Sequence, residues 1–423
     1  MRTRIRKAGR WSGFLTLVIF IVTGVAVSYA AEELRIGVPD LPRRVQAELP
    51  DLRPEQRIEF GILRLHPSFQ TKYEYDDNIK LASDDENRKG DSIFTQTLGI
   101  IGEVDLGDHR LEGGYGAEIV DFVKDHEENA INHMGYGQAE FSFGDLQITL
   151  KDLFEKTTSR LFEETSARDR YLINTVDTLA RYDRPRWAAE IGWRLNTVAH
   201  VDPLFEVNDY NEGVMALLAG YKILPKTLLL VETDLGFVQY DKTGNANQGY
   251  WQIFGGLRGE PTKSLTATAK IGFQDRQLGD VPGQGQQSDY AGVVADVDLL
   301  YRYSQRDSTR LSYNRTVRTS TFADNSWYRR DRIALSHSKR FLRKFVMTPI
   351  LGWQFNDYPE SATVGGQTKR RDDHFFQAEI SLRYEIKEWL STGAAYRFRS
   401  RQSNLNALDF ENNRFIFDIT LAY

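Results

Sequence analysis

The sequence predicts an all-β protein, a transmembrane antiparallel β-barrel of about 18 strands, with 16 as the alternative count. From residue 60 onward apolar and polar residues alternate, and a period of two places successive side chains on opposite faces of a strand. The predicted strands are about 11 to 16 residues long, whereas ordinary strands cluster near 5–6 residues. Short turns alternate with long polar loops, as in barrels with short periplasmic turns and long extracellular loops.

The composition excludes several classes of protein. The chain has 423 residues, a mean hydropathy of −0.48 and a net charge of −5 from 54 Lys+Arg and 59 Asp+Glu. A helical membrane protein needs repeated apolar runs of about 20 residues, and only one stretch comes near that length. The absence of cysteine excludes a disulfide scaffold and a thiolate metal site. The 20 Tyr and 24 Phe exclude a disordered chain, and the acidic balance with no recognised motif excludes nucleic-acid binding.

Residues 1–30 are predicted to be a secretory signal peptide. Five positive charges precede an apolar run, and Ser28 and Ala30 stand at positions −3 and −1 of a cleavage site. The alternative, a membrane anchor, needs about 20 apolar residues, and the run has about 14. Residues 31–58, with prolines at 39, 42, 50 and 54, are predicted to be a proline-rich periplasmic arm. A disordered tether is favoured for this arm over a periplasmic contact or a plug in the lumen.

The barrel itself is expected over residues 59–423. Apolar residues occupy alternate positions in 187–195, 265–273, 291–303, 345–355, 376–384, 390–398 and 415–423. Short turns are expected near 106–109, 144–145, 183–185, 260–263, 305–307 and 387–388. Long polar loops are expected at 77–91, 124–132, 157–169, 200–209, 241–248, 277–289, 358–372 and 402–411. This alternation of connections predicts one up-and-down meander of strands.

The chemistry of the two strand faces separates a membrane barrel from a soluble β-sandwich, because both folds produce alternation. Aromatic residues such as Trp187, Trp251 and Trp353 stand at strand ends and flanks, as the interfacial girdles of a barrel require. Ionised residues such as Glu140 and Asp234 lie mid-strand on the polar face, which suits a wet lumen. Closure also removes the exposed edges of such long strands, so we favour the membrane barrel.

The first and last predicted strands carry a resemblance to a known family. The opening strand and loop read Leu65-His-Pro-Ser-Phe-Gln-Thr-Lys-Tyr-Glu-Tyr-Asp-Asp-Asn78, and the closing strand reads Arg414-Phe-Ile-Phe-Asp-Ile-Thr-Leu-Ala-Tyr423. With these segments the chain resembles bacterial outer-membrane β-barrel porins found with exopolysaccharide biosynthesis genes. The resemblance implies a bacterial outer-membrane location and export of a secreted polysaccharide. Its implied partners are outer-membrane lipid, the polymer, and periplasmic or inner-membrane export components; it supplies no catalytic residue.

Patterns typical of enzymes are missing from the sequence. It has no G-x-S-x-G elbow, no H-E-x-x-H pair and no G-K-[ST] loop, so we predict no enzyme and no cofactor. His337, near Ser336 and Ser338, could serve a barrel lipase, but an interfacial histidine is favoured because no orienting partner is identifiable. Residues 241–247 space oxygen donors like part of a calcium loop, but Gln252 stands where such a loop needs glutamate. A hairpin loop is favoured there, a weak calcium site stays open, and no metal site is assigned.

Charge is unevenly distributed along the chain. Residues 301–423 contain 21 Lys+Arg and 13 Asp+Glu, a net of +8, whereas residues 31–300 contain 28 and 46, a net of −18. The candidate lumen residues are Arg302, Arg318, Arg330, Arg332, Arg383, Arg397, Arg399, Glu118, Glu190 and Asp296. One interpretation is a basic stripe that attracts an anionic polymer and gives it stepwise bidentate contacts. The other, of equal weight, is that the arginines pair with lumen carboxylates across the pore.

The predicted function is therefore passage of a secreted exopolysaccharide from the periplasm to the cell surface. A barrel of this size is wide enough for an aqueous channel. The first alternative is a passive diffusion porin for small hydrophilic solutes, which would conduct ions. The second is a structural or receptor barrel without throughput, which would have a blocked lumen.

Overall fold

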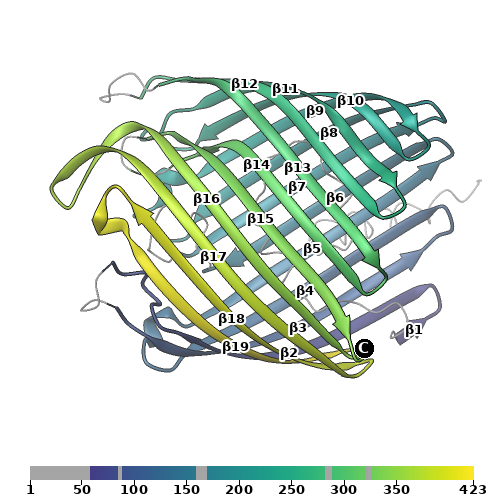
Figure 1. Cartoon of the computed structure of the whole chain (residues 1–423), viewed down its shortest axis with the longest axis horizontal. Helices are drawn as coiled ribbons and strands as arrows, with labels where there is room; N and C mark the ends of the chain where they lie inside the picture. The colour runs from purple at the N-terminus through teal and green to yellow at the C-terminus, as the bar shows by residue number, and fades with distance from the viewer. Residues whose placement is uncertain (1–57, 84–87, 159–168, 282–287, 321, 323–324) are drawn as a thin grey trace, which may run out of the picture.

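The long strands form a closed wall in the computed structural model, which describes residues 58–83, 88–158, 169–281, 288–320, 322 and 325–423. The predicted signal peptide, and the predicted arm up to residue 57, lie outside the described residues. Eighteen strands, β2 to β19, follow one another antiparallel around the wall, and β19 pairs with β2 to close it (Figure 1). The predicted strand count of about 18 is confirmed.

The described part of the chain is almost entirely strand. Its strands are β1 (Ile58–Phe60), β2 (Leu63–Asp76), β3 (Asp91–Asp105), β4 (His109–Phe122), β5 (Ala130–Phe143), β6 (Leu146–Thr157), β7 (Tyr171–Asp183), β8 (Trp187–His200), β9 (Tyr210–Leu224), β10 (Thr227–Tyr240), β11 (Gln248–Thr262), β12 (Leu265–Leu278), β13 (Tyr290–Ser304), β14 (Asp307–Thr319), β15 (Trp327–Phe341), β16 (Phe345–Val364), β17 (Gln367–Lys387), β18 (Leu390–Ser403) and β19 (Phe410–Ala422). Single-turn 3-10 helices lie in the connections, η2 (His126–Glu128), η3 (Glu206–Asn208) and η4 (Asn406–Leu408). Within the described ranges, none of the helices has the length and apolar character needed to cross a membrane.

Short and long connections alternate, as the sequence predicts. At one end of the barrel, the short-turn end, turns of two or three residues join β3 to β4, β5 to β6 and so on to β17 and β18. The opposite, long-loop end carries connections such as 77–90 and 201–209. Strand β2 begins and strand β19 finishes at the short-turn end, where the C-terminus lies (Figure 1).

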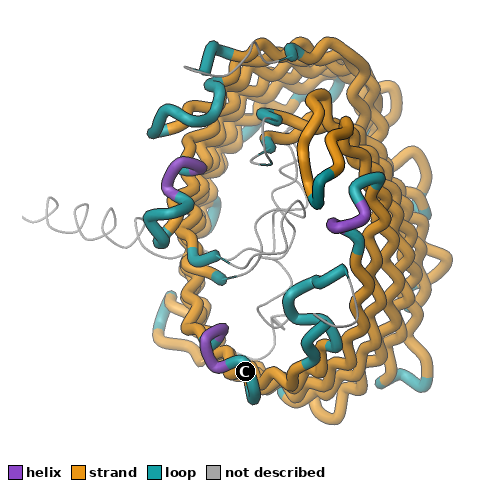
Figure 2. Tube along the Cα trace, turned by 90° about the vertical axis from the view of Figure 1, so that its left-hand side faces the viewer, coloured by secondary structure: helices purple, strands orange, loops and turns teal. Residues whose placement is uncertain are grey.

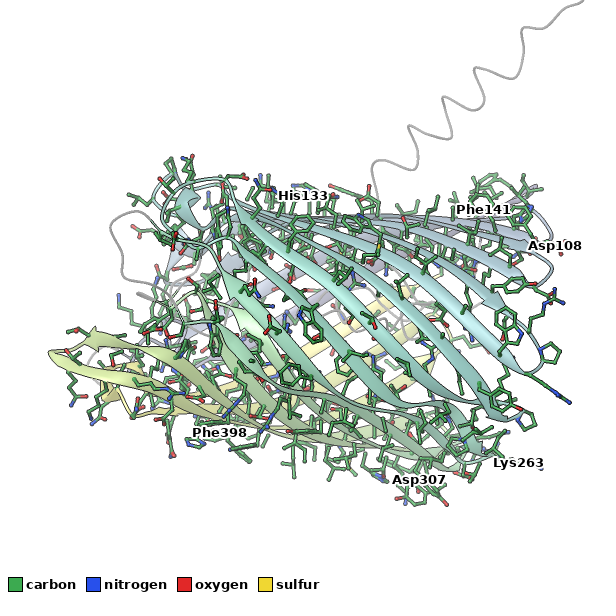
Figure 3. The ribbon with its side chains drawn as sticks, turned by 90° about the horizontal axis from the view of Figure 1, so that it is seen from above. Asp108, His133, Phe141, Lys263, Asp307 and Phe398 are labelled. Atoms are coloured by element: carbon green, nitrogen blue, oxygen red, sulfur yellow. The ribbon has the colours of Figure 1, made fainter. Side chains whose placement is uncertain are left out.

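The two faces of the wall differ in chemistry. In β8, Trp187, Ile191 and Trp193 are 46%, 51% and 42% exposed, whereas the alternate residues Ala188 and Glu190 are 1% and 6% exposed. The exposed row faces away from the barrel and the alternate row faces the lumen. Figure 3 shows the outer surface from above, with side chains projecting from it on both sides of the barrel. The outside of the wall is thus an apolar, aromatic belt of the kind that meets lipid.

The lumen face of the wall carries apolar clusters as well as polar residues. Towards the long-loop end of β7 to β10, buried residues pack together: Tyr171, Ile173, Val198, Tyr210, Val238 and Tyr240. Towards the short-turn end of β8 to β10, a second cluster contains Ala188, Leu218, Leu228 and Leu230. A simple division into apolar outside and polar inside therefore does not hold for this part of the wall.

The predicted loop 358–372 is wrong, because these residues form a strand hairpin. Strands β16 and β17 have 20 and 21 residues and are joined by Gly365 and Gly366, whose φ angles are 58° and 77°. Positive φ at both central residues is the requirement of a tight hairpin turn, and glycine meets it without strain. The hairpin extends past the neighbouring strands (Figure 1). Beyond the lipid neither strand face is constrained to be apolar, so the alternation that identifies the other strands is lost here.

Candidate functional site

The ten candidate residues from the sequence all have the strand parity of the lumen face. On β18, for example, Arg397 and Arg399 alternate with the outward-facing Tyr396 and Phe398. The acidic candidates come from β4, β8 and β13, and the arginines come from β13, β14, β15, β17 and β18. Strands β13 to β18 are consecutive neighbours, so the arginines belong to one sector of the wall. Their role in a substrate path stays a prediction.

Two of the acidic candidates are held by partners on nearby strands. The Glu190 side chain is 3% exposed; Arg258 donates to its carboxylate, and Arg181 Nε lies 3.4 Å from Oε1. Glu118 accepts a hydrogen bond of 2.8 Å from Asn132 Nδ2 on the adjacent strand. These contacts follow the wall, and pairing across the pore stays a prediction.

The third acidic candidate, Asp296, lies beside a buried charge group on β10 to β12. Lys270 Nζ is 2.9 Å from Glu232 Oε1 and 3.9 Å from Asp296 Oδ2, and the Lys270 and Glu232 side chains are 1% and 0% exposed. Gln252 Nε2 donates to Asp234 Oδ2 at 2.6 Å, and Asp234 is 0% exposed. Charges removed from water need such partners. The sequence analysis did not identify Lys270, because its partners are set by strand neighbours that the alternation alone does not reveal.

Two basic candidates are also engaged along the wall. Arg397 Nε donates to Glu379 Oε2 at 2.7 Å, and the two residues face each other on β18 and β17. Arg330 is 7% exposed, and its Nη2 lies 3.4 Å from Asn314 Oδ1. The pairing interpretation therefore has a direct contact at Arg397, again with a neighbouring strand.

Other arginines of this sector are more accessible. Arg302, Arg332 and Arg383 are exposed, and Arg318 and Arg399 are half-buried. Arg302 lies near the short-turn end of β13, where its Nη1 donates to Thr266 Oγ1 at 2.8 Å. The arginines of this sector thus differ in exposure, and the choice between the basic stripe and the pairing interpretation stays a prediction.

Two buried arginines lie at the long-loop end of the same sector. Arg371 is 0% exposed, and its guanidinium carbon lies 4.1 Å and 4.7 Å from the ring centroids of Phe322 and Tyr358. It also donates to the Asp373 carboxylate at distances of 2.7 to 3.1 Å. Arg401, 3% exposed, lies over two further aromatic rings. The spacing of Arg371 and Asp373, two apart and so on one strand face, was the available signal.

Contacts between connections hold the long-loop end together. Gln248 Nε2 on β11 donates to the Ser326 carbonyl at 2.8 Å. Asn325 Oδ1 accepts from the backbone of Glu360 on β16 at 2.8 Å, and the Ser288 amide lies 3.2 Å from Glu360 Oε1. These bonds join segments that are distant in sequence. Figure 2, which looks into this end, shows connections gathered around and inside the rim.

His337 lies on the outer face of the wall. Its Nδ1 is 2.9 Å from Thr309 Oγ1 and its Nε2 is 3.3 Å from Asp307 Oδ1, so orienting partners that the sequence did not reveal are present. Ser336 and Ser338 have the opposite parity and face the lumen. Thr309 and His337 face each other on the paired strands β14 and β15. A lipase needs backbone amides that donate to the oxyanion of its substrate, and here the amides take part in strand pairing instead. These contacts describe an interfacial histidine.

The loop 241–247 uses its polar groups within the protein. Asn247 Oδ1 accepts a hydrogen bond of 2.8 Å from the Tyr240 amide. Lys242 Nζ contacts the Glu206 carboxylate, and this hydrogen bond raises the pKa of Lys242. Among the described residues, no group of three or more His, Asp or Glu side chains is arranged to hold a metal ion. A hairpin loop accounts for these contacts.

Comparison with known proteins gives the following similarities. Residues 207–423 match the family model described as Putative beta-barrel porin 2. No curated protein matches the chain. In fold, the chain is similar to OccAB3 of Acinetobacter baumannii, with a TM-score of 0.46 and 12% identity over 86% of this chain and 100% of that chain. OpdL of Pseudomonas aeruginosa has a TM-score of 0.45 and 11% identity, over 86% of this chain and 99% of that chain. A bacterial polysaccharide outer membrane secretin has a TM-score of 0.35 and 12% identity, over 84% of this chain and 98% of that chain.

The family match begins just before β9 and runs to the last residue, so it covers more than half of the chain and all seven candidate arginines. The closed wall of 18 strands and its apolar outer belt agree with this match. The association with exopolysaccharide genes that the resemblance implied stays a prediction. The chain belongs to the Putative beta-barrel porin 2 family, and it is a β-barrel porin of the bacterial outer membrane.

Proposed function

We propose that this porin passes a secreted, negatively charged exopolysaccharide from the periplasm to the cell surface. The supporting observation is a difference in exposure between the charges of the lumen. In β13 to β18, Arg302, Arg332 and Arg383 are exposed, whereas the side chains of the lumen acids Asp298 and Glu379 are 12% and 13% exposed. A solute in the lumen would therefore meet more positive than negative charge along this sector.

The depth of the exposed arginines suits a long polymer better than a single small anion. Arg302 stands two residues from the periplasmic end of β13, and Arg383 stands four residues from the same end of β17. Arg332 lies further along β15, nine residues from the short-turn end of that strand at Phe341. Guanidinium groups bind carboxylates with paired hydrogen bonds. Contacts at several depths, each weak, let a polymer enter and still leave. Polymer synthesis, or an inner-membrane partner, would supply the direction.

The second candidate is diffusion of small hydrophilic solutes. The observation that favours it is the family match, since the family is described as porins. A diffusion porin with the same arginines would select small anions without binding a polymer. A structural barrel without throughput is the third candidate, and it would conduct no ions.

Recordings from planar lipid bilayers distinguish these three functions. Acidic polygalacturonate oligomers, added from the periplasmic side, are expected to interrupt the ion current at concentrations at which neutral dextran of equal length has no effect. An ion current that neither polymer interrupts would support a diffusion porin. No ion current at all would support the structural barrel.

A deletion strain tests the same proposal in the cell. We expect loss of surface polysaccharide with accumulation of polymer in the periplasm, and restoration of export by the plasmid-borne gene. Normal secretion of every polymer in the deletion strain would overturn the proposed export.

A further inference from the structure

The pairing of the last strand with the first is the one strand contact of the barrel wall that no connection of the chain supports. Every neighbouring pair from β2–β3 to β18–β19 is consecutive in sequence, and nine of these seventeen pairs are joined by turns of two or three residues. A short turn fixes the register of its two strands. Strands β19 and β2 lie side by side (Figure 1) but are separated by almost the whole barrel sequence, so their register needs another determinant.

Alternation of apolar and polar residues supplies only part of this determinant. A slip by one residue would turn the lumen residues of β19 towards lipid, which the belt excludes. A slip by two residues keeps every side chain on its proper face, because the period of a strand is two. The apolar pattern therefore cannot distinguish the observed register from registers displaced by two residues.

Polar side chains at the outer half of this seam match one another in the observed register. Arg414 of β19 lies between two acids of β2, with Nε 3.0 Å from Asp76 Oδ2 and Nη1 3.1 Å from Glu74 Oε1. Asn412 Nδ2 donates to Asp76 Oδ1 at 2.6 Å, and Asn412 Oδ1 accepts from Arg414 Nε at 2.9 Å. Asp76 and Asn412 are both 0% exposed, so each would lose its partners in a place that water does not reach.

The outward-facing side of the seam repeats this match. Asp77 Oδ1 accepts from the Asn413 backbone at 2.7 Å, and Asp77 Oδ2 accepts from Asn413 Nδ2 at 2.8 Å. The Asp77 amide in turn donates to the Asn413 carbonyl at 3.1 Å. The Asp-Asp-Asn segment at 76–78, which carried the resemblance at the start of the chain, therefore contacts β19 through its side chains.

Displacing β19 by two residues breaks this match in either direction. In the observed register Asp418 faces Lys72. One displacement would place Asp418 opposite Glu74, a like charge. The other would place Asp418 opposite Gln70 and Arg414 opposite Glu74, so Asp418 would lose its facing Lys72 and Asp76 would no longer face Arg414. Like charges at facing positions destabilise a strand pair, and opposite charges stabilise it.

We infer that the side chains of Glu74, Asp76, Asp77, Asn412, Asn413 and Arg414, together with the facing pair Lys72 and Asp418, set the register in which this barrel closes. We call these eight residues the closure lock. It acts on assembly and not on solute passage, so the inference is independent of the proposed function.

The absence of cysteine makes the register directly measurable. The pair Tyr73→Cys with Phe417→Cys reports the observed register, because these residues face each other on the outer side of the wall. Tyr75→Cys or Thr71→Cys, each combined with Phe417→Cys, reports one of the two displaced registers. Facing positions on paired strands are close enough for a disulfide. With the closure lock intact, only the Tyr73–Phe417 pair is expected to cross-link on oxidation.

The substitution Lys72→Asp is expected to displace β19 in one particular direction. It places two carboxylates opposite each other in the observed register, and displacement that brings Asp418 to Gln70 relieves this repulsion. The Thr71–Phe417 cross-link is expected to rise by about fivefold, the change in an equilibrium that about 1 kcal/mol produces. Exchanging both charges, Lys72→Asp with Asp418→Lys, is expected to restore the Tyr73–Phe417 cross-link alone.

Arg194→Gln is the matched control. Arg194 pairs with Asp177 on the adjacent strand, but a three-residue turn joins these two strands and fixes their register. This variant should therefore give only the Tyr73–Phe417 cross-link.

The inference is overturned if the Lys72→Asp variant yields the same cross-links as the protein whose closure lock is unsubstituted. If Lys72→Asp fails to assemble, the charge-exchanged variant decides. Restored assembly supports the closure lock, and continued failure overturns it.

Discussion

Lys270 Nζ lies 2.9 Å from Glu232 Oε1 on the lumen face, and neither side chain is more than 1% exposed. This pair joins β12 to β10 across the intervening strand β11. Because both charges are removed from water, neither can be deleted alone without leaving the other buried and uncompensated.

Lys270→Met is accordingly expected to lower the free energy of unfolding by about 3–5 kcal/mol. The measurement is urea unfolding of the barrel reconstituted in lipid vesicles. The double variant Lys270→Met with Glu232→Leu should recover most of the loss, because it removes both charges. An equal loss in the single and double variants would contradict this account.

The wall also contains a glycine over which an aromatic ring lies. A Cβ at Gly236 would fall 2.1 Å from the ring of Tyr250, which is 5% exposed. Gly236→Ala is therefore expected to cost about 1–3 kcal/mol by forcing the ring to move. Gly255→Ala is the matched control, since nothing lies within 4 Å of its Cβ position. Thermal or urea unfolding should separate the two variants, and equal stability would show that the ring moves without cost.

The arginines of the lumen sector lead to a prediction about ion selectivity. Arg332→Glu, or Arg397→Glu combined with Arg399→Glu, should shift the permeability ratio towards cations. A change of about fivefold corresponds to a charge interaction of about 1 kcal/mol in water. Reversal potentials in a salt gradient measure this ratio. Lys339→Glu, on the outer face of β15, is the control and should leave the reversal potential unchanged.

Arg371 leads to a prediction about the long-loop end. Arg371→Gln would leave the Asp373 carboxylate, 0% exposed, without its guanidinium partner. We expect faster cleavage of the outer connections by protease added to intact cells, because the loss is local to that end. Arg340→Gln breaks an arginine–carboxylate pair with Glu385 near the short-turn end and serves as the control. Equal cleavage in both variants would contradict a local role for Arg371.

The sequence predicts the wall well and its internal contacts poorly, for one physical reason. Lipid on one side of a strand and water on the other impose alternation, and alternation is visible in a single sequence. Trp187 to Trp193 illustrate this, since their exposed and buried positions follow the predicted period. The loop predicted at 358–372 was wrong, because no lipid constrains this hairpin to an apolar–polar alternation.

Side-chain contacts between strands depend on the strand register, and the alternation of apolar and polar residues does not predict that register. The sequence identified Glu190 as a lumen residue but could not assign Arg258, three strands away, as its partner. The burial of Arg371 was not predicted, because the polar stretch that contains it was interpreted as a loop. The arginines that remain exposed, such as Arg332, were placed correctly on the lumen face, because parity alone decides the face.

The hairpin of β16 and β17 has a practical consequence for the intact bacterium. Its tip at Gly365 and Gly366 is followed by Gln367, Thr368 and Lys369, all exposed and hydrophilic. A porin with its long connections outside the cell presents this tip to antibodies, bacteriophages and labelling reagents. The tip is therefore the natural place to insert an epitope and to follow the protein on living cells without entering the barrel.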